Sequence, residues 1–273
     1  MSQKVTQVIG IASGKGGVGK TCIASNLAVS LAMRGRKVML FDADMGLANA
    51  QLAFGVRTNL NFSHVLSGQN TLKEIIVTTS QGVRLVPGAS GIQQMASLDA
   101  VKSAGIIQAF SELDEDIDYF IIDAAAGIAD SVVTFMQGAQ RRYIVMRDEP
   151  SSITDAYGMI KVLAAEHGLD EIYLIPNMVD SQEAGQTLYR HVSDVCKRFL
   201  GADIGYLNSI VNDEHMLGAS RAYKSVLEFA PGGGAARDFR QLALATEQLE
   251  QLSDVTGGMQ FFVERFTGRT QVA

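Results

Sequence analysis

Cysteine is scarce in this sequence, and that scarcity excludes several kinds of site. The 273 residues include two cysteines, Cys22 and Cys196, which lie far apart and form no C-x-x-C pair. Such spacing indicates neither a disulfide framework nor a zinc site. Iron–sulfur chemistry needs suitably placed cysteine ligands, and the chain offers none.

Positive charge is also in short supply. The chain has 23 Lys and Arg against 29 Asp and Glu, a net charge of −6, and a pI of about 5.3. Non-specific DNA binding needs clustered cations, so no direct nucleic-acid binding is expected. Arg141, Arg142 and Arg147 flank one predicted strand, and Lys197 and Arg198 close a predicted helix. Solvated ends of secondary structure explain these basic residues.

Long uncharged apolar runs and a secretion signal are not evident either. No such run approaches the ~20 residues that span a membrane, and the N-terminus lacks the pattern of a signal peptide. We therefore expect a cytoplasmic protein. The hydrophobic content of 47% suits one large α/β domain with a full core.

Apolar runs alternate with stretches of helical periodicity along the chain. Strands are predicted at residues 5–12, 37–41, 83–86, 118–122, 142–146 and 171–175. Helices are predicted at residues 21–33, 99–113, 131–138, 151–167, 183–200 and 235–252. This order predicts an α/β fold with a doubly wound, mostly parallel sheet and helices on both faces. In such sheets ligands bind at the carboxyl ends of the strands.

The segment between the first strand and the first helix carries a phosphate-binding loop. Residues 13–21 read S-G-K-G-G-V-G-K-T and fit the pattern G-x-x-x-x-G-K-[ST]. Glycines let backbone N–H groups crowd around phosphate oxygens. Lys20 can pair with the β- and γ-phosphates, and the Thr21 hydroxyl can ligate Mg²⁺. The predicted nucleotide-contacting residues here are Gly14, Lys15, Gly16, Gly17, Val18, Gly19, Lys20, Thr21 and Cys22.

Acidic residues follow two other predicted strands. Asp42 and Asp44 lie just past the second strand, and Asp123 ends the fourth. A carboxylate at the tip of a buried strand suits a Mg²⁺ site, and a second one can orient an attacking water. A solvated turn is the plainer explanation of the Asp42–Asp44 pair, because Asp is common in turns.

The loop resembles that of the MinD/ParA group of ATPases, whose signature is K-G-G-x-G-K-[ST]. Residues 42–49, D-A-D-M-G-L-A-N, resemble the switch I segment of that group, and residues 123–127, D-A-A-A-G, resemble its switch II. The resemblance implies ATP and Mg²⁺ as cofactors, with Lys20 and Lys15 as catalytic lysines and Lys15 crossing the interface of an ATP-sandwiched dimer. It implies that Asp44 activates the attacking water and that Thr21, Asp42 and Asp123 form the Mg²⁺ site. Ala124 occupies the position where the group has a hydroxyl residue, so we expect the rate of ATP hydrolysis to be affected more than nucleotide binding.

Base recognition is predicted from the same resemblance. Asn177 follows the sixth strand, where the group has an adenine-contacting Asn, although a turn Asn is the plainer explanation. Val211 and Asp213 lie where its second base-side loop falls, with Val211 in place of the usual proline.

The C-terminus carries a short apolar stripe. Met259, Phe262, Val263 and Phe266 are spaced i, i+3, i+4 and i+7, which predicts one helical face after a linker. We therefore divide the chain into an ATPase domain at 1–253 and a linker and amphipathic tail at 254–273. A membrane surface, a partner protein or a groove on the domain itself can cover the stripe.

Further segments are similar to the flagellar-number regulators of the FlhG/FleN branch. They are residues 148–157, D-E-P-S-S-I-T-D-A-Y, and 261–266, F-F-V-E-R-F. This resemblance implies control of flagellar number through a σ54-type transcription activator and a flagellar-placement GTPase. The glutamine-containing N-terminal motif of many such proteins is absent, which favours the anti-activator role over GTPase stimulation. A cell-division MinD protein and a ParA partitioning protein stay open as alternatives.

Overall fold

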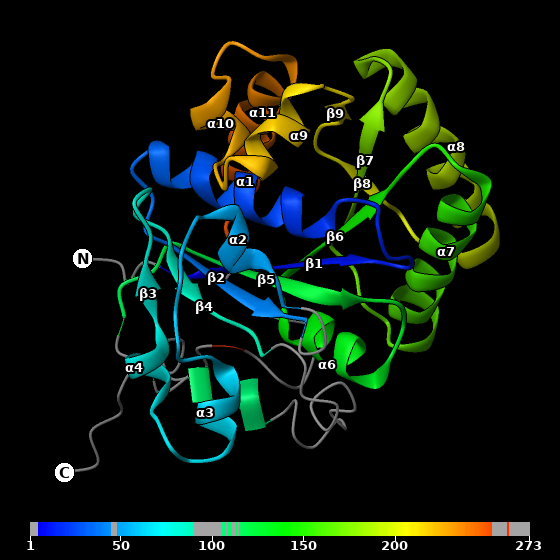
Figure 1. The fold of residues 1–273 in the computed structure, drawn as a ribbon. Helices are drawn as coiled ribbons and strands as arrows, with labels where there is room; N and C mark the ends of the chain where they lie inside the picture. The colour runs from blue at the N-terminus through cyan, green and yellow to red at the C-terminus, as the bar shows by residue number, and fades with distance from the viewer. Residues whose placement is uncertain are drawn as a thin grey trace.

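The strands form one twisted sheet whose centre is parallel. The structure, a computed structural model, describes residues 5–44, 48–89, 105–107, 109–110, 113, 115–252 and 261. The strand order is β3-β4-β2-β5-β1-β6-β7-β8, with β9 also paired to β7 (Figure 1). Every pairing is parallel except that of β3 with β4. The strands are β1 Gln7–Ser13, β2 Val38–Ala43, β3 Val77–Thr78, β4 Arg84–Val86, β5 Tyr119–Ala126, β6 Arg141–Met146, β7 Ile172–Val179, β8 Gly205–Tyr206 and β9 Ile210–Val211.

One face of the sheet is covered by the helix that follows the glycine loop and by the C-terminal helices (Figure 1). These helices are α1 Lys20–Met33, α9 His215–Arg221, α10 Val226–Phe229 and α11 Gly234–Gln248, and the short helix α2 Ala50–Ala53 lies on the same face. Alternate strand residues such as Ile9, Ile11 and Ile121 pack against Leu27 of α1 and Phe239 of α11. This layer forms one of the two apolar cores.

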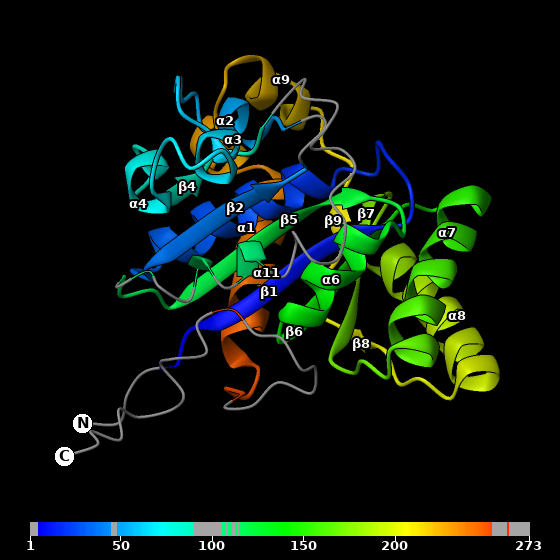
Figure 2. The ribbon, with the colours of Figure 1, turned by 90° about the horizontal axis from the view of Figure 1, so that it is seen from below.

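The other face is covered by a second set of helices (Figure 2), and the second apolar core lies between them and the sheet. Its helical elements are α3 Phe62–Leu66, α4 Leu72–Ile75, α6 Asp130–Gly138, α7 Pro150–Ile160, a π-helical continuation η1 Lys161–Glu166 and α8 Gln182–Leu200. The intervening strand residues, such as Phe41, Phe120 and Ile144, point into this layer. Each central strand is therefore buried on both sides, which explains why the sequence shows continuous apolar runs there.

The predicted α/β class and both-sided helix cover are confirmed, and each predicted strand corresponds to an observed one. The predicted helix at 99–113 lies mostly outside the described residues, of which 105–107 and 109–110 are helical. The predicted solvation of the two arginines in β6 is wrong, because Arg141 is 4% exposed and Arg142 is fully buried. Backbone carbonyls of Met136, Ala139 and Asp170 accept hydrogen bonds from the Arg142 guanidinium.

Candidate active site

The glycine loop joins β1, in the middle of the sheet, to the start of α1. Gly17 and Gly19 have φ angles of 80° and 92°, a region that side chains disfavour. A Cβ on Gly14 would lie 2.2 Å from the Asp155 carbonyl oxygen in α7, so this position has no room for a side chain. The loop is therefore built from glycines because its backbone must turn tightly and approach α7 closely.

Lys20 and Asp123 meet under this loop. The Lys20 Nζ lies 3.0 Å from Asp123 Oδ1, and both side chains are nearly closed off from solvent. Burial raises the pKa of Asp123, although the Lys20 charge and the Thr21 side chain act in the opposite direction. The second carboxylate oxygen, Oδ2, is buried and has no hydrogen-bond partner among the described residues. The site thus holds a buried carboxylate with one oxygen available.

Asp42 lies beside Asp123, because β2 and β5 are neighbours and the two residues pair in register. Its carboxylate accepts hydrogen bonds from the backbone N–H groups of Asp44, Asn49 and Ala50. Burial and the nearby Asp123 charge raise the pKa of Asp42 to about 7, against the effect of these hydrogen bonds. The carboxylate therefore fixes the start of α2 at the edge of the site.

Asp44, the proposed water-activating residue, comes directly after β2 and is partly exposed. Residues 45–47 lie outside the described residues. The structure therefore gives the position of Asp44 next to Asp42 but not the rest of the segment that resembles switch I.

Lys15 contacts its own chain. Its Nζ donates to the Ser151 hydroxyl at 2.9 Å and lies 3.6 Å from Glu149 Oε2. Arg147 pairs with the other oxygen of Glu149 at 3.2 Å. Sequence reasoning assigned no role to Ser151 or Glu149, although both lie within residues 148–157, the segment quoted for the flagellar-regulator resemblance.

Asn177 supports the loop from β7. Its side-chain amide donates to the Val18 carbonyl at 2.7 Å, and the Asn177 side chain is almost completely buried. A Cβ on Gly19 would lie 2.3 Å from the Asn177 Nδ2. The structure thus brings Asn177 to the loop, while contact with a base stays a prediction.

Val211 and Asp213 lie farther along the same edge. Val211 pairs with Val179 through β9 and β7, and its N–H donates to the Asp238 carboxylate. Both oxygens of Asp213 accept hydrogen bonds from backbone N–H groups, one from His215 and one from Ala235. Burial raises the pKa of Asp213, but these hydrogen bonds outweigh it and leave the pKa below the ordinary value. The Asp213 carboxylate therefore already joins α9 to α11.

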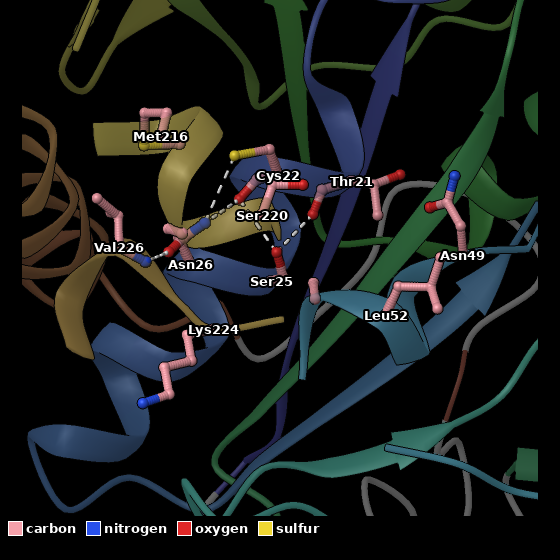
Figure 3. A pocket seen from close by; sticks show the side chains of 12 residues that line it. Thr21, Cys22, Ser25, Asn26, Asn49, Leu52, Met216, Ser220, Lys224 and Val226 are labelled. Carbon is pink, nitrogen blue, oxygen red and sulfur yellow. Dashed lines mark hydrogen bonds between the residues drawn. The ribbon is translucent and has the colours of Figure 1, made fainter. Parts of the chain in front are cut away.

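A cavity of about 260 Å³ opens beside the first turns of α1, between α2 and α9 (Figure 3). Of the predicted site residues, only Thr21 and Cys22 line it. Burial raises the pKa of the Cys22 thiol to about 12, so it is a neutral group that packs beside Asn26.

These residues fit a magnesium nucleotide. A glycine loop at a helix start offers backbone donors to phosphate, and Lys20 adds a buried positive charge. Mg²⁺ in such sites takes one or two carboxylates and a hydroxyl besides phosphate oxygens and water. Asp123 Oδ2 and the Thr21 hydroxyl supply these ligand types. Within the described ranges, no cluster of three His, Cys, Asp or Glu residues forms a metal cage of its own.

Fold and site together define a P-loop nucleotide-binding protein. The model of the CobQ/CobB/MinD/ParA nucleotide-binding domain matches residues 9–221. The antiactivator FleN of Pseudomonas aeruginosa is 40% identical over 97% of this chain and 94% of its own length. The flagellum site-determining protein YlxH of Helicobacter pylori is 36% identical over 90% of this chain and 83% of its own.

A solved structure with a similar fold supports the same family. The septum site-determining protein MinD of Pyrococcus horikoshii, complexed with Mg-ADP, matches with a TM-score of 0.76 and 28% identity over 89% of this chain and 97% of that chain. The chain belongs to the MinD/ParA family of nucleotide-binding ATPases, and the likeness to its flagellar-regulator branch is confirmed at the sequence level. Among the described residues, no helix has the length and apolar character that crossing a membrane requires.

Proposed function

We propose that this protein is a regulatory switch that binds ATP with Mg²⁺, forms a homodimer in that state and resets by slow hydrolysis. The observation that carries the proposal is the buried Lys20–Asp123 pair beneath the glycine loop, with no hydrogen-bond partner for Asp123 Oδ2 among the described residues. A buried unpartnered carboxylate oxygen is costly unless a ligand uses it. A bound magnesium ion would meet that need, since Asp123 Oδ2 would then serve as one of its ligands.

The proposed roles follow from where the side chains lie. Lys20 and the backbone N–H groups of the loop bind phosphate oxygens. Thr21 and Asp123 hold the metal, which neutralises charge on the phosphates, and Asp42 supports this region. Asp44 orients the attacking water. Asn177, Val211 and Asp213 bound the adenine side, where Asn177 also holds the loop through Val18.

Lys15 is proposed to act on the nucleotide of the second subunit, where it stabilises charge that develops in phosphoryl transfer. In the single chain its amine is held by Ser151 and Glu149. These contacts are partly exposed and individually weak, so dimer formation can replace them.

The relatives suggest what the switch controls. We propose that it limits flagellar number as an anti-activator of a σ54-type transcription activator, in line with the name of the P. aeruginosa relative. The second proposed partner is a flagellar-placement GTPase. The proposed location is the cytoplasm and the inner face of the membrane.

The C-terminal segment is part of this proposal. We divide the chain into an ATPase domain at 1–253 and a tail at 254–273, with membrane contact through Met259, Phe262, Val263 and Phe266. These four residues lie outside the described part of the chain.

The test is the size of the protein with Mg²⁺ and ATP, for wild type and Asp44→Ala, measured by light scattering after gel filtration. We expect the mutant to accumulate as an ATP-bound dimer, because it binds ATP but does not activate water. ADP is the control and should leave both proteins monomeric. Failure of both to dimerise with ATP would contradict the switch. A pull-down with a purified σ54-type activator, compared with a cell-division partner, then tests the flagellar role.

A further inference from the structure

A groove of about 420 Å³ lies on the α1 side of the sheet, away from the phosphate loop. Its walls come from α2 and the loop after it, from the turn between β3 and β4, and from the turn between α9 and α10. Leu52 and Lys224, two of the residues that line the cavity beside Thr21 (Figure 3), also line this groove, so the two hollows adjoin. The proposed mechanism uses no residue of this groove.

Tyr223 lies in this groove in a conformation that its residue type disfavours. It follows α9 with φ of 54°, a helix-ending position where glycine is usual. The turn is closed by the Lys224 N–H, which donates to the Ala219 carbonyl. A bulky residue with positive φ is an outlier that the rest of the fold must hold in place. Because the Tyr223 side chain is 55% exposed, core packing does not account for it.

The groove combines an apolar surface with positive charge. Leu52, which is 51% exposed, lines the groove together with Tyr223. Arg57 and Lys224 also line the groove, and neither side chain has an ion-pair partner among the described residues. The single carboxylate of the lining, Glu228, accepts hydrogen bonds from Gln81 and from the Ser225 N–H. In a chain of net charge −6, two cations that no described residue pairs with, next to an exposed Tyr and Leu, match an anionic partner.

One wall of the groove is attached to the candidate active site. The N–H groups of Asn49 and Ala50, at the start of α2, donate to the Asp42 carboxylate. Leu52 is in this four-residue helix. A change of charge at the metal region therefore acts on the same carboxylate that holds the groove wall.

We propose that this groove is a docking site for an acidic segment of a partner protein, with an apolar side chain of that segment on Leu52 and Tyr223 and its carboxylates on Arg57 and Lys224. Tyr and Arg are the residue types that dominate binding energy in such interfaces. Helical or extended segments with spaced apolar anchors fit grooves of this kind. The inference deepens the proposed function, on which it rests, by naming the partner's chemistry.

The probe is a phage-displayed library of random 12-residue peptides, selected on the full-length protein. Enriched peptides are labelled with fluorescein, and binding is measured by anisotropy. The test variant is Arg57→Glu/Lys224→Glu. The control is Lys73→Glu/Lys161→Glu, which makes the same charge change at exposed positions that do not line the groove. We expect peptides that carry carboxylates next to apolar residues, binding at least tenfold weaker to the test variant and unchanged to the control.

Tyr223→Gly separates docking from a structural role. Glycine suits the positive φ, so the unfolding midpoint should stay or rise while peptide affinity falls at least tenfold. The proposal is overturned if no acidic peptide is enriched, or if the enriched peptides bind both charge variants equally. Nucleotide-free self-association that the test variant loses would make the groove an interface between copies and would also overturn it. Calorimetric titration of the wild type with Mg²⁺ and ATP measures nucleotide binding and so tests the proposed function separately, because peptide binding does not require nucleotide.

Discussion

Gly19 shows how one residue satisfies two constraints at the phosphate loop. Its φ of 92° lies in the left-handed region, and its missing side chain leaves room for the Asn177 amide. Asn177 in turn donates to the Val18 carbonyl. Loop shape and the contact with β7 therefore depend on the same glycine.

We expect Gly19→Ala to lower nucleotide affinity at least tenfold. The substitution costs about 1 kcal/mol for the positive φ, and its Cβ must also displace Asn177. Calorimetric titration with Mg²⁺ and ADP measures the effect. Gly35→Ala is the matched control, because Gly35 has a similar φ of 82°, lies outside the phosphate loop, and a Cβ there meets no atom within 4 Å. Equal affinities for the two variants would contradict this account of the loop.

Ala124 gives a second prediction at the residue scale. The sequence predicts that its missing hydroxyl affects ATP turnover, but the structure places Ala124 fully buried in the apolar core on the face opposite α1. Ala124→Ser would bury a hydroxyl there and should cost about 1–3 kcal/mol of stability, with turnover per folded molecule unchanged. Thermal unfolding and steady-state ATP hydrolysis measure both. A changed turnover at unchanged stability would instead support the sequence-based expectation.

At the scale of elements, ion pairs of one carboxylate connect α11 to the turn between α1 and β2. Glu247 pairs with both Arg34 and Arg36. Burial raises the pKa of Glu247, but the hydrogen bonds and charges of the two arginines outweigh it and lower the pKa below the ordinary value. A lowered folded-state pKa means that the stabilisation is present above the unfolded-state pKa of about 4.3. It is lost as the pH falls through the folded-state value.

Glu247→Gln should therefore destabilise the protein by about 1 kcal/mol at pH 7, an amount typical of partly exposed ion pairs. The difference from wild type should shrink as the pH falls below about 4.3. Urea unfolding at several pH values between 7 and 3.5 measures it. Glu166→Gln, at an exposed carboxylate that no described residue pairs with, is the control and should show no such trend. A constant difference across the pH range would contradict the ion-pair explanation.

The long elements could be predicted from the sequence because their apolar patterns are continuous. The central strands and α1, α8 and α11 all carry such patterns. The short helices α2, α9 and α10 and the two-residue strands β8 and β9 give too short a pattern, and their positions depend on tertiary contacts. The same limit applies to Arg142, whose burial depends on carbonyls from α6 and from the residues before β7.

Some features of the candidate site also have a local sequence pattern, and others depend on tertiary contacts. The loop motif and the carboxylates at strand ends could be read from the sequence, because one strand–loop–helix unit and two apolar runs define them. The link from Asp42 to the start of α2 and the contact between Lys15 and Ser151 depend on side-chain directions. The contact of Asn177 with the loop joins residues 159 positions apart, which no local pattern encodes.

At the scale of the whole molecule, a residue near the C-terminus completes the core on the face opposite α1. The ring of Phe261 is 1% exposed and lies 5.6 Å from the Phe110 ring and 5.1 Å from the Phe120 ring, centre to centre. Gly138, at the end of α6, makes room for it, because a Cβ there would lie 3.0 Å from the Phe261 ring. A membrane, a partner protein or the domain itself can cover the apolar tail, and for this one phenylalanine the domain does so.

Phe261→Ala should destabilise the nucleotide-free protein by about 3–5 kcal/mol, because it removes a buried ring from a packed aromatic cluster. Urea unfolding of the full chain measures the loss. Phe199→Ala is the matched control, since Phe199 is 65% exposed and the same truncation there should change stability by no more than about 0.5 kcal/mol. If the two substitutions have equally small effects, the Phe261 ring is not held in the core in solution. The whole stripe around it would then be available to a membrane or a partner in every nucleotide state. A large loss at Phe261 alone means that exposing this part of the tail costs several kcal/mol, which nucleotide binding or a partner must supply.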